Sequence, residues 1–163
     1  MVDITSIDGL KENINCIGCA LVSKKIKNPF PIIYEDEYFM VSQDYEVPIS
    51  GFVVLASKRH IQGILDFTEI ELKFFYRLLK IIRLALKECL GINYVMLFSN
   101  ESKIISKINP SHFHFCFLPK DGFESKNLNE TLAYAKANMK TEENFKKVQE
   151  SALKLKEYIS NSV

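Results

Sequence analysis

The stretch HFHFCFLP, residues 112–119, decides how the whole sequence is interpreted. Residues two apart in a β-strand share a face, so we expect His112, His114 and Cys116 on one face and the alternating phenylalanines on the other. The phenylalanines are expected to pack into the core. The histidine face then carries either half-exposed polar residues on the wet side of a sheet or chemically active groups, and the strand alone allows both.

Three neighbouring stretches predict the partners of this strand. Residues 31–44 alternate around an acidic turn and predict a β-hairpin, whereas residues 51–57 and 93–99 are short apolar runs that predict single strands. Strands that are joined first as a hairpin and then through a helix are typical of an α+β domain with an antiparallel sheet. We therefore expect one α+β domain over residues 1–163.

The segment that connects these strands predicts one long helix. Thr68 and Glu71 stand in capping-box spacing, good helix formers follow, and Gly91 is a C-terminal signal. The apolar stripe of this helix is wider than one face, which predicts burial on two sides, the second by a partner chain. A polar amphipathic helix from about residue 129 to residue 158 is expected to close the chain.

Composition and charge narrow the class of protein. The chain has 163 residues, 47% of them hydrophobic, and a formal net charge of +1. A nucleic-acid groove normally raises the positive charge well above this, so no nucleic-acid partner is expected. The N-terminus lacks a signal-peptide pattern, and Arg83 and Lys87 interrupt the most apolar segment, so we expect no membrane partner and a soluble, cytoplasmic protein.

Four residues form a candidate metal site. Cysteines in a cytoplasmic protein are expected to be thiols or metal ligands rather than disulfides. A Cys-x-x-C pair with two distant histidines offers the ligand types that tetrahedral Zn²⁺ accepts, and these residues are Cys16, Cys19, His60 and His112.

The Cys-x-x-C pair also allows other interpretations. A thioredoxin-like redox pair opens a helix just after a strand, and the sequence predicts no strand before Cys16. A zinc ribbon needs a second Cys-x-x-C, which Cys89 and Cys116 do not supply. Spacing alone leaves zinc, a redox pair and unliganded thiols open.

Several motifs in order resemble one family. HFHFCFLP resembles the H-x-H-x-H strand of the histidine triad (HIT) superfamily of nucleotide hydrolases and transferases. CIGC at 16–19 is similar to its CIFC motif, and IYEDEYFMVSQD at 33–44 to its VYEDEHVLAFLD hairpin. GFVVLASKRHIQGILDFTEIE at 51–71 and LFSN at 97–100 resemble the strands that carry its histidine and asparagine. The resemblance covers about residues 14–120 and points to the zinc-bearing bacterial branch, with a helical extension at about 129–160.

The resemblance implies roles for these residues. The zinc-bearing branch holds a structural zinc with the positions of Cys16, Cys19, His60 and His112, the set that ligand chemistry also proposes. His114 falls on the family's nucleophile, which attacks the α-phosphorus of a nucleotide and forms a nucleotidyl-histidine. Such a histidine needs its second ring nitrogen held by a hydrogen bond, usually to a backbone carbonyl.

The resemblance also implies a small-molecule nucleotide as the ligand. Asp44 matches the carboxylate that accepts the ribose hydroxyls, and Asn100 matches a residue at the phosphates. From the residues alone, a turn cap for Asp44 and an ordinary strand-end asparagine for Asn100 remain alternatives. Because HIT domains pair through the long helix and a neighbouring strand, a homodimer is expected.

The sequence departs from the family pattern at three places. Cys116 replaces the third histidine, a hydrogen-bond donor to the reacting phosphate, and a thiol is a weak donor. The family's GQS/T segment reads KINPSH, with Ile108 in place of glutamine, and Lys107, Asn109 and Ser111 are the candidate substitutes. Ser42 stands where an aromatic residue is expected, so Phe39 or Tyr45 is expected to stack on the base.

Three functions therefore compete. The first is a zinc-containing nucleotide hydrolase or nucleotidyl transferase that works through His114 and Cys116. The second is a catalytically weak or inactive HIT module that binds a nucleotide and a structural zinc, or that serves as a dimeric structural protein. The third is a redox or unrelated zinc protein. The changes at Cys116 and Ile108 separate the first two.

Overall fold

A computed structural model of the chain describes residues 2–5, 11–14, 16–101 and 112–163. The strands and helices follow one another as β1 (Val2–Thr5), β2 (Lys11–Ile14), α1 (Ile17–Val22), β3 (Ile32–Glu35), β4 (Phe39–Gln43), β5 (Val53–Ser57), a 3₁₀ turn η1 (Ile64–Asp66), α2 (Glu69–Leu90), β6 (Val95–Ser99), β7 (His114–Pro119), α3 (Leu128–Asn138) and α4 (Glu142–Ser160).

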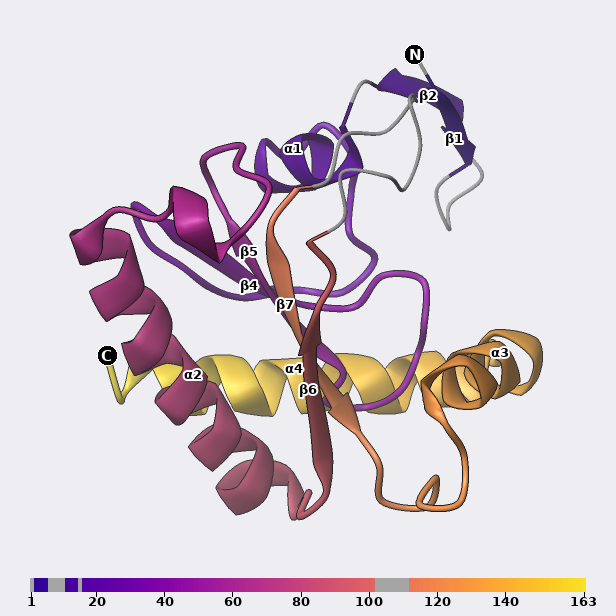
Figure 1. The fold of residues 1–163 in the computed structure, drawn as a ribbon. Coiled ribbons are helices and arrows are strands. Elements are labelled where there is room, and N and C mark those ends of the chain that lie inside the picture. The colour runs from indigo at the N-terminus through magenta and orange to yellow at the C-terminus, as the bar shows by residue number, and fades with distance from the viewer. Residues whose placement is uncertain (1, 6–10, 15, 102–111) are drawn as a thin grey trace.

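The main sheet has five antiparallel strands in the order β3-β4-β5-β7-β6. The predicted hairpin is β3–β4, and the other three predicted strands are β5, β6 and β7 (Figure 1). β7 lies between β5 and β6, so Ala56 is paired with His114 on one side and Ser99 with Phe115 on the other. The α+β class with an antiparallel sheet is therefore confirmed.

The long helix α2 begins and ends where its sequence signals predict. The Thr68 side chain accepts from the Glu71 backbone N–H, and the Glu71 carboxylate accepts from the Thr68 N–H. At the other end Gly91 adopts a left-handed conformation, with φ of 67°, which glycine enters without steric cost.

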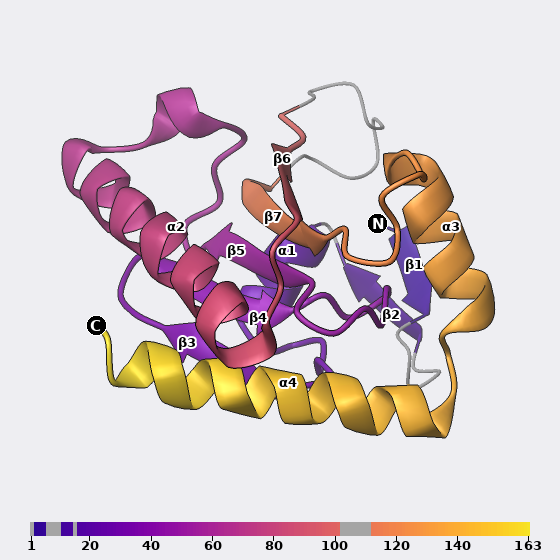
Figure 2. The same ribbon diagram turned by 90° about the horizontal axis from the view of Figure 1, so that it is seen from below.

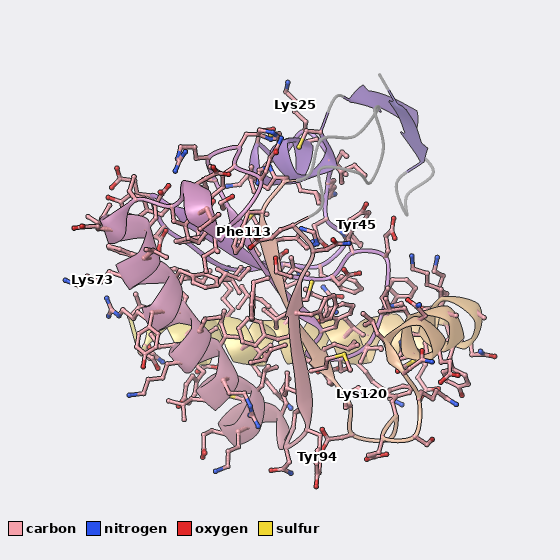
Figure 3. All side chains as sticks on the ribbon, in the orientation of Figure 1. Lys25, Tyr45, Lys73, Tyr94, Phe113 and Lys120 are labelled. Carbon is pink, nitrogen blue, oxygen red and sulfur yellow. The ribbon has the colours of Figure 1, made fainter. Side chains whose placement is uncertain are left out.

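The sheet separates two layers, which Figure 2 shows from below. On one face, Phe39, Leu55 and Phe117 pack against α2 and α4 in the main core. On the other face a smaller core forms around Cys116 and Leu118 and includes Ala135 of α3. Figure 3 shows Phe113 on the α2 side of β7 and Tyr45 on the opposite side. The predicted division of β7 into a phenylalanine face and a histidine face is correct.

The expected single C-terminal helix is wrong, because the chain forms α3 and α4 with a break at residues 139–141. Thr141 caps the start of α4 by accepting from the Asn144 backbone N–H. The Asn144 amide also donates to the carbonyls of Met139 and Pro48, which fixes the corner against the β4–β5 loop. The Thr141 cap and the hydrogen bonds of the Asn144 amide therefore stabilise the turn that separates α3 from α4.

The second side of α2 is covered from within the chain. Ala152, Leu155 and Ile159 of α4 belong to the same core as α2 and β3. The burial on two sides that the wide apolar stripe of α2 predicts is therefore supplied in part by α4. Leu84 and Tyr76 of α2 remain exposed.

The N-terminal part differs from the expectation. β1 and β2 form an antiparallel hairpin, β2 ends just before the Cys-x-x-C pair, and Cys16 is the N-cap of α1. The premise that no strand precedes Cys16 is wrong, because the polar sequence KENI lacks the alternation that predicts a strand. In the described parts of the chain, no helix combines the length and apolar character needed to cross a membrane.

Candidate functional site

The floor of the site is a row of side chains across three adjacent strands. Met40 of β4 is paired with Ala56 of β5, which is paired with His114 of β7. The next row, two residues along, consists of Ser42, Val54 and Cys116. These six residues line a cavity of about 280 Å³ on the face of the sheet opposite α2.

The walls of this cavity come from two segments. Ile17, Gly18 and Leu21 of α1 contribute one wall, and Asp44 and Tyr45 at the end of β4 contribute another. The α1 wall is largely apolar, and the β4 end supplies a carboxylate and a phenol. A cavity with apolar walls and a few convergent polar groups is typical of small-molecule sites.

The predicted metal ligands lie together beside the cavity. The ligand atoms of Cys16, Cys19, His60 and His112 all lie within 4.8 Å of one another. His60 Nδ1 is 3.5 Å from Cys16 Sγ and 3.2 Å from Cys19 Sγ. His112 Nδ1 is 3.6 Å and 3.4 Å from the same two sulfurs.

These distances fit tetrahedral coordination. Metal–sulfur and metal–nitrogen bonds of about 2.3 and 2.05 Å at the tetrahedral angle separate sulfur and nitrogen by about 3.6 Å. The four observed S···N distances, from 3.2 to 3.6 Å, lie at or slightly below this value. The donor set is the one that Zn²⁺ accepts in structural sites.

The surroundings of the four residues also suit a cation. His112 Nε2 lies 2.7 Å from the Ser57 carbonyl oxygen, which orients the ring with Nδ1 toward the sulfurs. Burial lowers the pKa of His112 and so favours the neutral, metal-binding form. Burial, and then the adjacent Cys16 sulfur, raise the pKa of Cys19 to about 11. Cys16 and Cys19 can therefore both be thiolates only when a positive charge lies nearby.

His114 has the arrangement that a nucleophilic histidine needs. Its Nδ1 lies 2.9 Å from the carbonyl oxygen of His112 and donates to it, which fixes the tautomer of the neutral ring with its proton on Nδ1. The Ser99 hydroxyl donates to the carbonyl of His114 at 2.9 Å and holds the backbone from the β6 side. The ring is half-buried and lines the cavity.

Cys116 is a buried thiol rather than a charged group. The residue is 4% exposed. Burial, and the nearby Asp44 carboxylate, raise its pKa to about 12. The side chain therefore presents a neutral S–H, a weak donor, to the cavity.

Asp44 caps a turn and also lines the cavity. Its Oδ1 accepts from the backbone N–H groups of Glu46 and Val47, at 2.9 and 2.7 Å, so it caps a turn. The residue also lines the cavity, and burial raises the pKa of its carboxyl to about 6. The neighbouring Tyr45 lines the cavity as well, and its hydroxyl donates to the Glu46 carboxylate at 3.2 Å.

The other predicted residues are distributed differently. Phe39 is wrong as a base-stacking residue, because it is fully buried in the α2 core with its ring edge-on to Phe67. Asn100 follows β6 on the surface. Asn109, like Lys107, Ile108 and Ser111, lies outside the described residues.

Two residues that contribute to the site could not be identified from the sequence. Ser57 acts through its backbone carbonyl, which any residue has. Gly18 lies where an added Cβ would be 2.3 Å from Cγ of His112, a contact that only the fold reveals.

No family model matches the chain. The Protein hit of Bacillus subtilis is 28% identical over 109 residues, which cover 66% of this chain and 72% of that relative.

Solved structures resemble the chain over most of its length. A histidine triad nucleotide-binding protein of Sulfolobus tokodaii has a TM-score of 0.62 at 20% identity, covering 90% of this chain and 93% of that one. A Zn-bound histidine triad family protein of Mycobacterium smegmatis has a TM-score of 0.59, also at 20% identity, covering 90% and 94%. The resemblance to the histidine triad superfamily is thereby confirmed, and the chain has the fold of that superfamily.

Proposed function

We propose that the chain is a zinc-containing nucleotide hydrolase or nucleotidyl transferase that reacts at the α-phosphate through His114. The observation that carries this proposal is the hydrogen bond from His114 Nδ1 to the His112 carbonyl at the floor of a ligand-sized cavity. It selects the tautomer in which Nε2 has a free lone pair, the form that attacks phosphorus.

The proposed reaction has two steps. Nε2 forms a bond to the α-phosphorus while the bond from phosphorus to the leaving group breaks, and the leaving group departs with its electron pair and takes up a proton. The positive charge that develops on the ring is stabilised by the Nδ1–H bond to the His112 carbonyl. Water or another acceptor then attacks the phosphorus and loses its proton to solvent, while the bond from phosphorus to Nε2 breaks and its electron pair returns to the ring.

The ligand is proposed to lie between the β4 end and α1. Asp44 is proposed to accept the ribose hydroxyls with its second carboxylate oxygen, and Tyr45 to contact the base. Asn100 and Asn109 are proposed to contact the phosphates, as the resemblance implies. The name of the S. tokodaii protein, a nucleotide-binding protein, supports a nucleotide as the ligand.

Zinc is proposed to be structural. The donor set and its S···N distances fit a zinc ion, and the M. smegmatis relative is a Zn-bound protein. When bound, the ion supplies a cross-link between α1, the segment after β5 and the start of β7. His60 and His112 would hold it together with Cys16 and Cys19.

The assembly and location of the chain complete the proposal. One domain spans residues 1–163, with its core at about 14–120 and the helical part at about 129–160. Ile70, Leu72, Tyr76 and Leu84 leave apolar surface of α2 exposed, which supports a homodimer. The four free cysteines agree with a cytoplasmic protein.

An inactive nucleotide-binding module is the second candidate. The neutral thiol of Cys116, with its pKa of about 12, favours it. Among the described residues that line the cavity there is no lysine or arginine, so little positive charge faces a phosphate.

One experiment decides between them. The purified chain is mixed with adenosine and guanosine phosphoramidates and dinucleoside polyphosphates that carry a label on the nucleotidyl group, and the protein is quenched within one turnover. We expect an acid-labile nucleotidyl-protein in wild type and none in His114→Ala. Equal labelling of the two would refute the nucleophile, and no labelling with any substrate would favour the inactive module.

A further inference from the structure

Ser42 places a buried hydroxyl in the floor of the cavity. The residue is 7% exposed, and Met40 and Asp44, two residues before and after it, line the same cavity. The Ser42 hydroxyl forms no hydrogen bond with any residue that the structure describes. Buried polar side chains usually have a hydrogen-bond partner, because burying a hydroxyl without one is unfavourable. A buried hydroxyl of this kind at a cavity therefore points to a partner that enters the cavity.

The surroundings of this hydroxyl on the sheet are apolar. Val54 of β5 is its cross-strand neighbour, and Met40 and Ala56 form the adjacent row of the floor. Ile17 and Leu21 of α1 add further apolar surface to the cavity. A single hydroxyl in such surroundings selects among ligands, because a ligand polar group that meets it is satisfied and one that meets only apolar side chains is not.

The sheet sets the distance between this hydroxyl and the reactive histidine. Neighbouring strands lie about 4.8 Å apart, so β4 and β7, which have β5 between them, are separated by about 10 Å. A nucleotide with its α-phosphorus at His114 and its sugar at Asp44 leaves its base between β4 and α1. A flat base that packs its faces against the α1 and Tyr45 walls directs an edge to the floor, where Ser42 lies.

We propose that Ser42 determines base specificity through a hydrogen bond between its hydroxyl and an exocyclic amino or oxo group of the nucleobase. This inference rests on the proposed function and names the part of the ligand that the site distinguishes. Exocyclic groups project furthest from the ring, and a hydroxyl can donate to an oxo group or accept from an amino group. An aromatic side chain, which the family resemblance expects at this position, would stack on any base, whereas a hydroxyl responds to the groups on the base edge.

The test combines a change in the protein with a change in the ligand. Calorimetry gives the affinities of zinc-loaded wild type and Ser42→Ala for adenosine and guanosine monophosphate, and for purine riboside monophosphate, which lacks exocyclic groups on the same ring system. We expect Ser42→Ala to weaken binding of at least one of the first two by about 3- to 10-fold, the range for one neutral hydrogen bond. The affinity for purine riboside monophosphate should not change.

A second serine provides the matched control. Ser151→Ala removes a hydroxyl on α4, outside the cavity, that donates to the Lys147 carbonyl at 2.9 Å. This variant should bind all three ligands as wild type does. Equal loss of affinity for the three ligands in Ser42→Ala would overturn the proposal, because the hydroxyl would then not distinguish the base edge.

Thermal unfolding separates recognition of the base from a structural role. Because the Ser42 hydroxyl has no partner among the described residues of the free chain, Ser42→Ala removes an unsatisfied polar group. We therefore expect its Tm to equal or exceed that of wild type while its nucleotide affinity falls. A lower Tm together with the same loss of affinity for every ligand would show that the hydroxyl supports the fold, and would overturn the proposal.

The outcomes also separate this inference from the proposed function. If wild type and Ser42→Ala bind every nucleotide equally well, the hydroxyl meets only water, and the role of Ser42 is overturned while the proposed function stands. A wild-type chain that binds none of the three ligands would overturn both.

Discussion

Replacing Cys116 by histidine would test whether the site is a weakened enzyme. The donor that stabilises charge on a reacting phosphate is worth about 2 to 4 kcal/mol when it is removed outright. At position 116 the thiol is neutral, with a pKa of about 12, so this stabilisation is largely missing in the natural chain.

Two opposing effects set the size of the gain. Position 116 is 4% exposed, and burial favours the neutral form of an imidazole placed there. The Asp44 carboxylate, which raises the pKa of the thiol, would instead favour the protonated form of the imidazole. We expect part of the full donor energy to be recovered, about 1.4 kcal/mol, which is a tenfold rise in kcat with a smaller change in KM. The ring must fit between Val54 and Phe98 on the neighbouring strands, and overpacking of this kind costs about 1 to 3 kcal/mol of stability.

The assay is single-turnover kinetics with the labelled substrates, and thermal unfolding is measured in parallel. Cys116→Val is the control, since it has no donor and adds one heavy atom, so it also reports the effect of added bulk at this position. A Cys116→His variant that is folded but no faster than wild type would refute the reasoning about the missing donor. A Cys116→Val variant as active as wild type would show that the thiol itself contributes nothing.

Four further outcomes are expected. Protein prepared without chelators should contain one zinc per chain by elemental analysis and lose several degrees of Tm on treatment with EDTA, since structural zinc contributes folding free energy; zinc content near zero would contradict this. Glu71→Gln should destabilise the chain by about 1 to 3 kcal/mol in denaturant titrations at neutral pH, because the bidentate bond to Arg59 and the cap of Thr68 are weakened. The pKa of Glu71 is lowered from 4.5 to about 2, so its contribution is complete above pH 4.5 and is lost as the pH falls toward 2; a wild-type acid unfolding curve identical to that of Glu71→Gln would argue against it. The pKa of Asp44 is about 6, so ribonucleotide affinity measured by calorimetry should fall as the pH drops through 6, with a smaller fall for the 2′-deoxynucleotide, and equal pH profiles would exclude a ribose contact. Light scattering at micromolar concentration should give twice the chain mass of 18.8 kDa, and Tyr76→Glu on the exposed face of α2 should return it to the monomer value.

Features set by local rules could be predicted from the sequence. The capping box at Thr68 and Glu71 and the left-handed Gly91 fix the ends of α2 through backbone hydrogen bonds within a few residues. The alternation at 113–117 fixes the faces of β7, because the period of a strand leaves no other arrangement. The four ligand types could be identified because few side chains bind zinc, although their proximity needed the fold.

Features set by distant contacts could not be predicted. The break at Thr141 is obscured by good helix formers on both sides, and the amide of Asn144 that fixes the corner reaches the Pro48 carbonyl, far away in the sequence. The cover of α2 by α4 depends on tertiary packing that periodicity does not reveal. A wide apolar stripe predicts only that a second surface covers the helix, and not which chain supplies it.

The spacing of His112 and His114 explains why the metal cluster and the cavity lie together. His112 directs Nδ1 toward the two sulfurs, and its own carbonyl accepts from Nδ1 of His114. The Ser57 carbonyl holds the His112 ring at Nε2, and the two sulfurs lie at Nδ1. These contacts to the ring also restrict the backbone of His112. Whatever displaces that ring also displaces the carbonyl that accepts from Nδ1 of His114. Under the proposed function, a structural ion at this place would therefore influence the reaction without contacting the substrate.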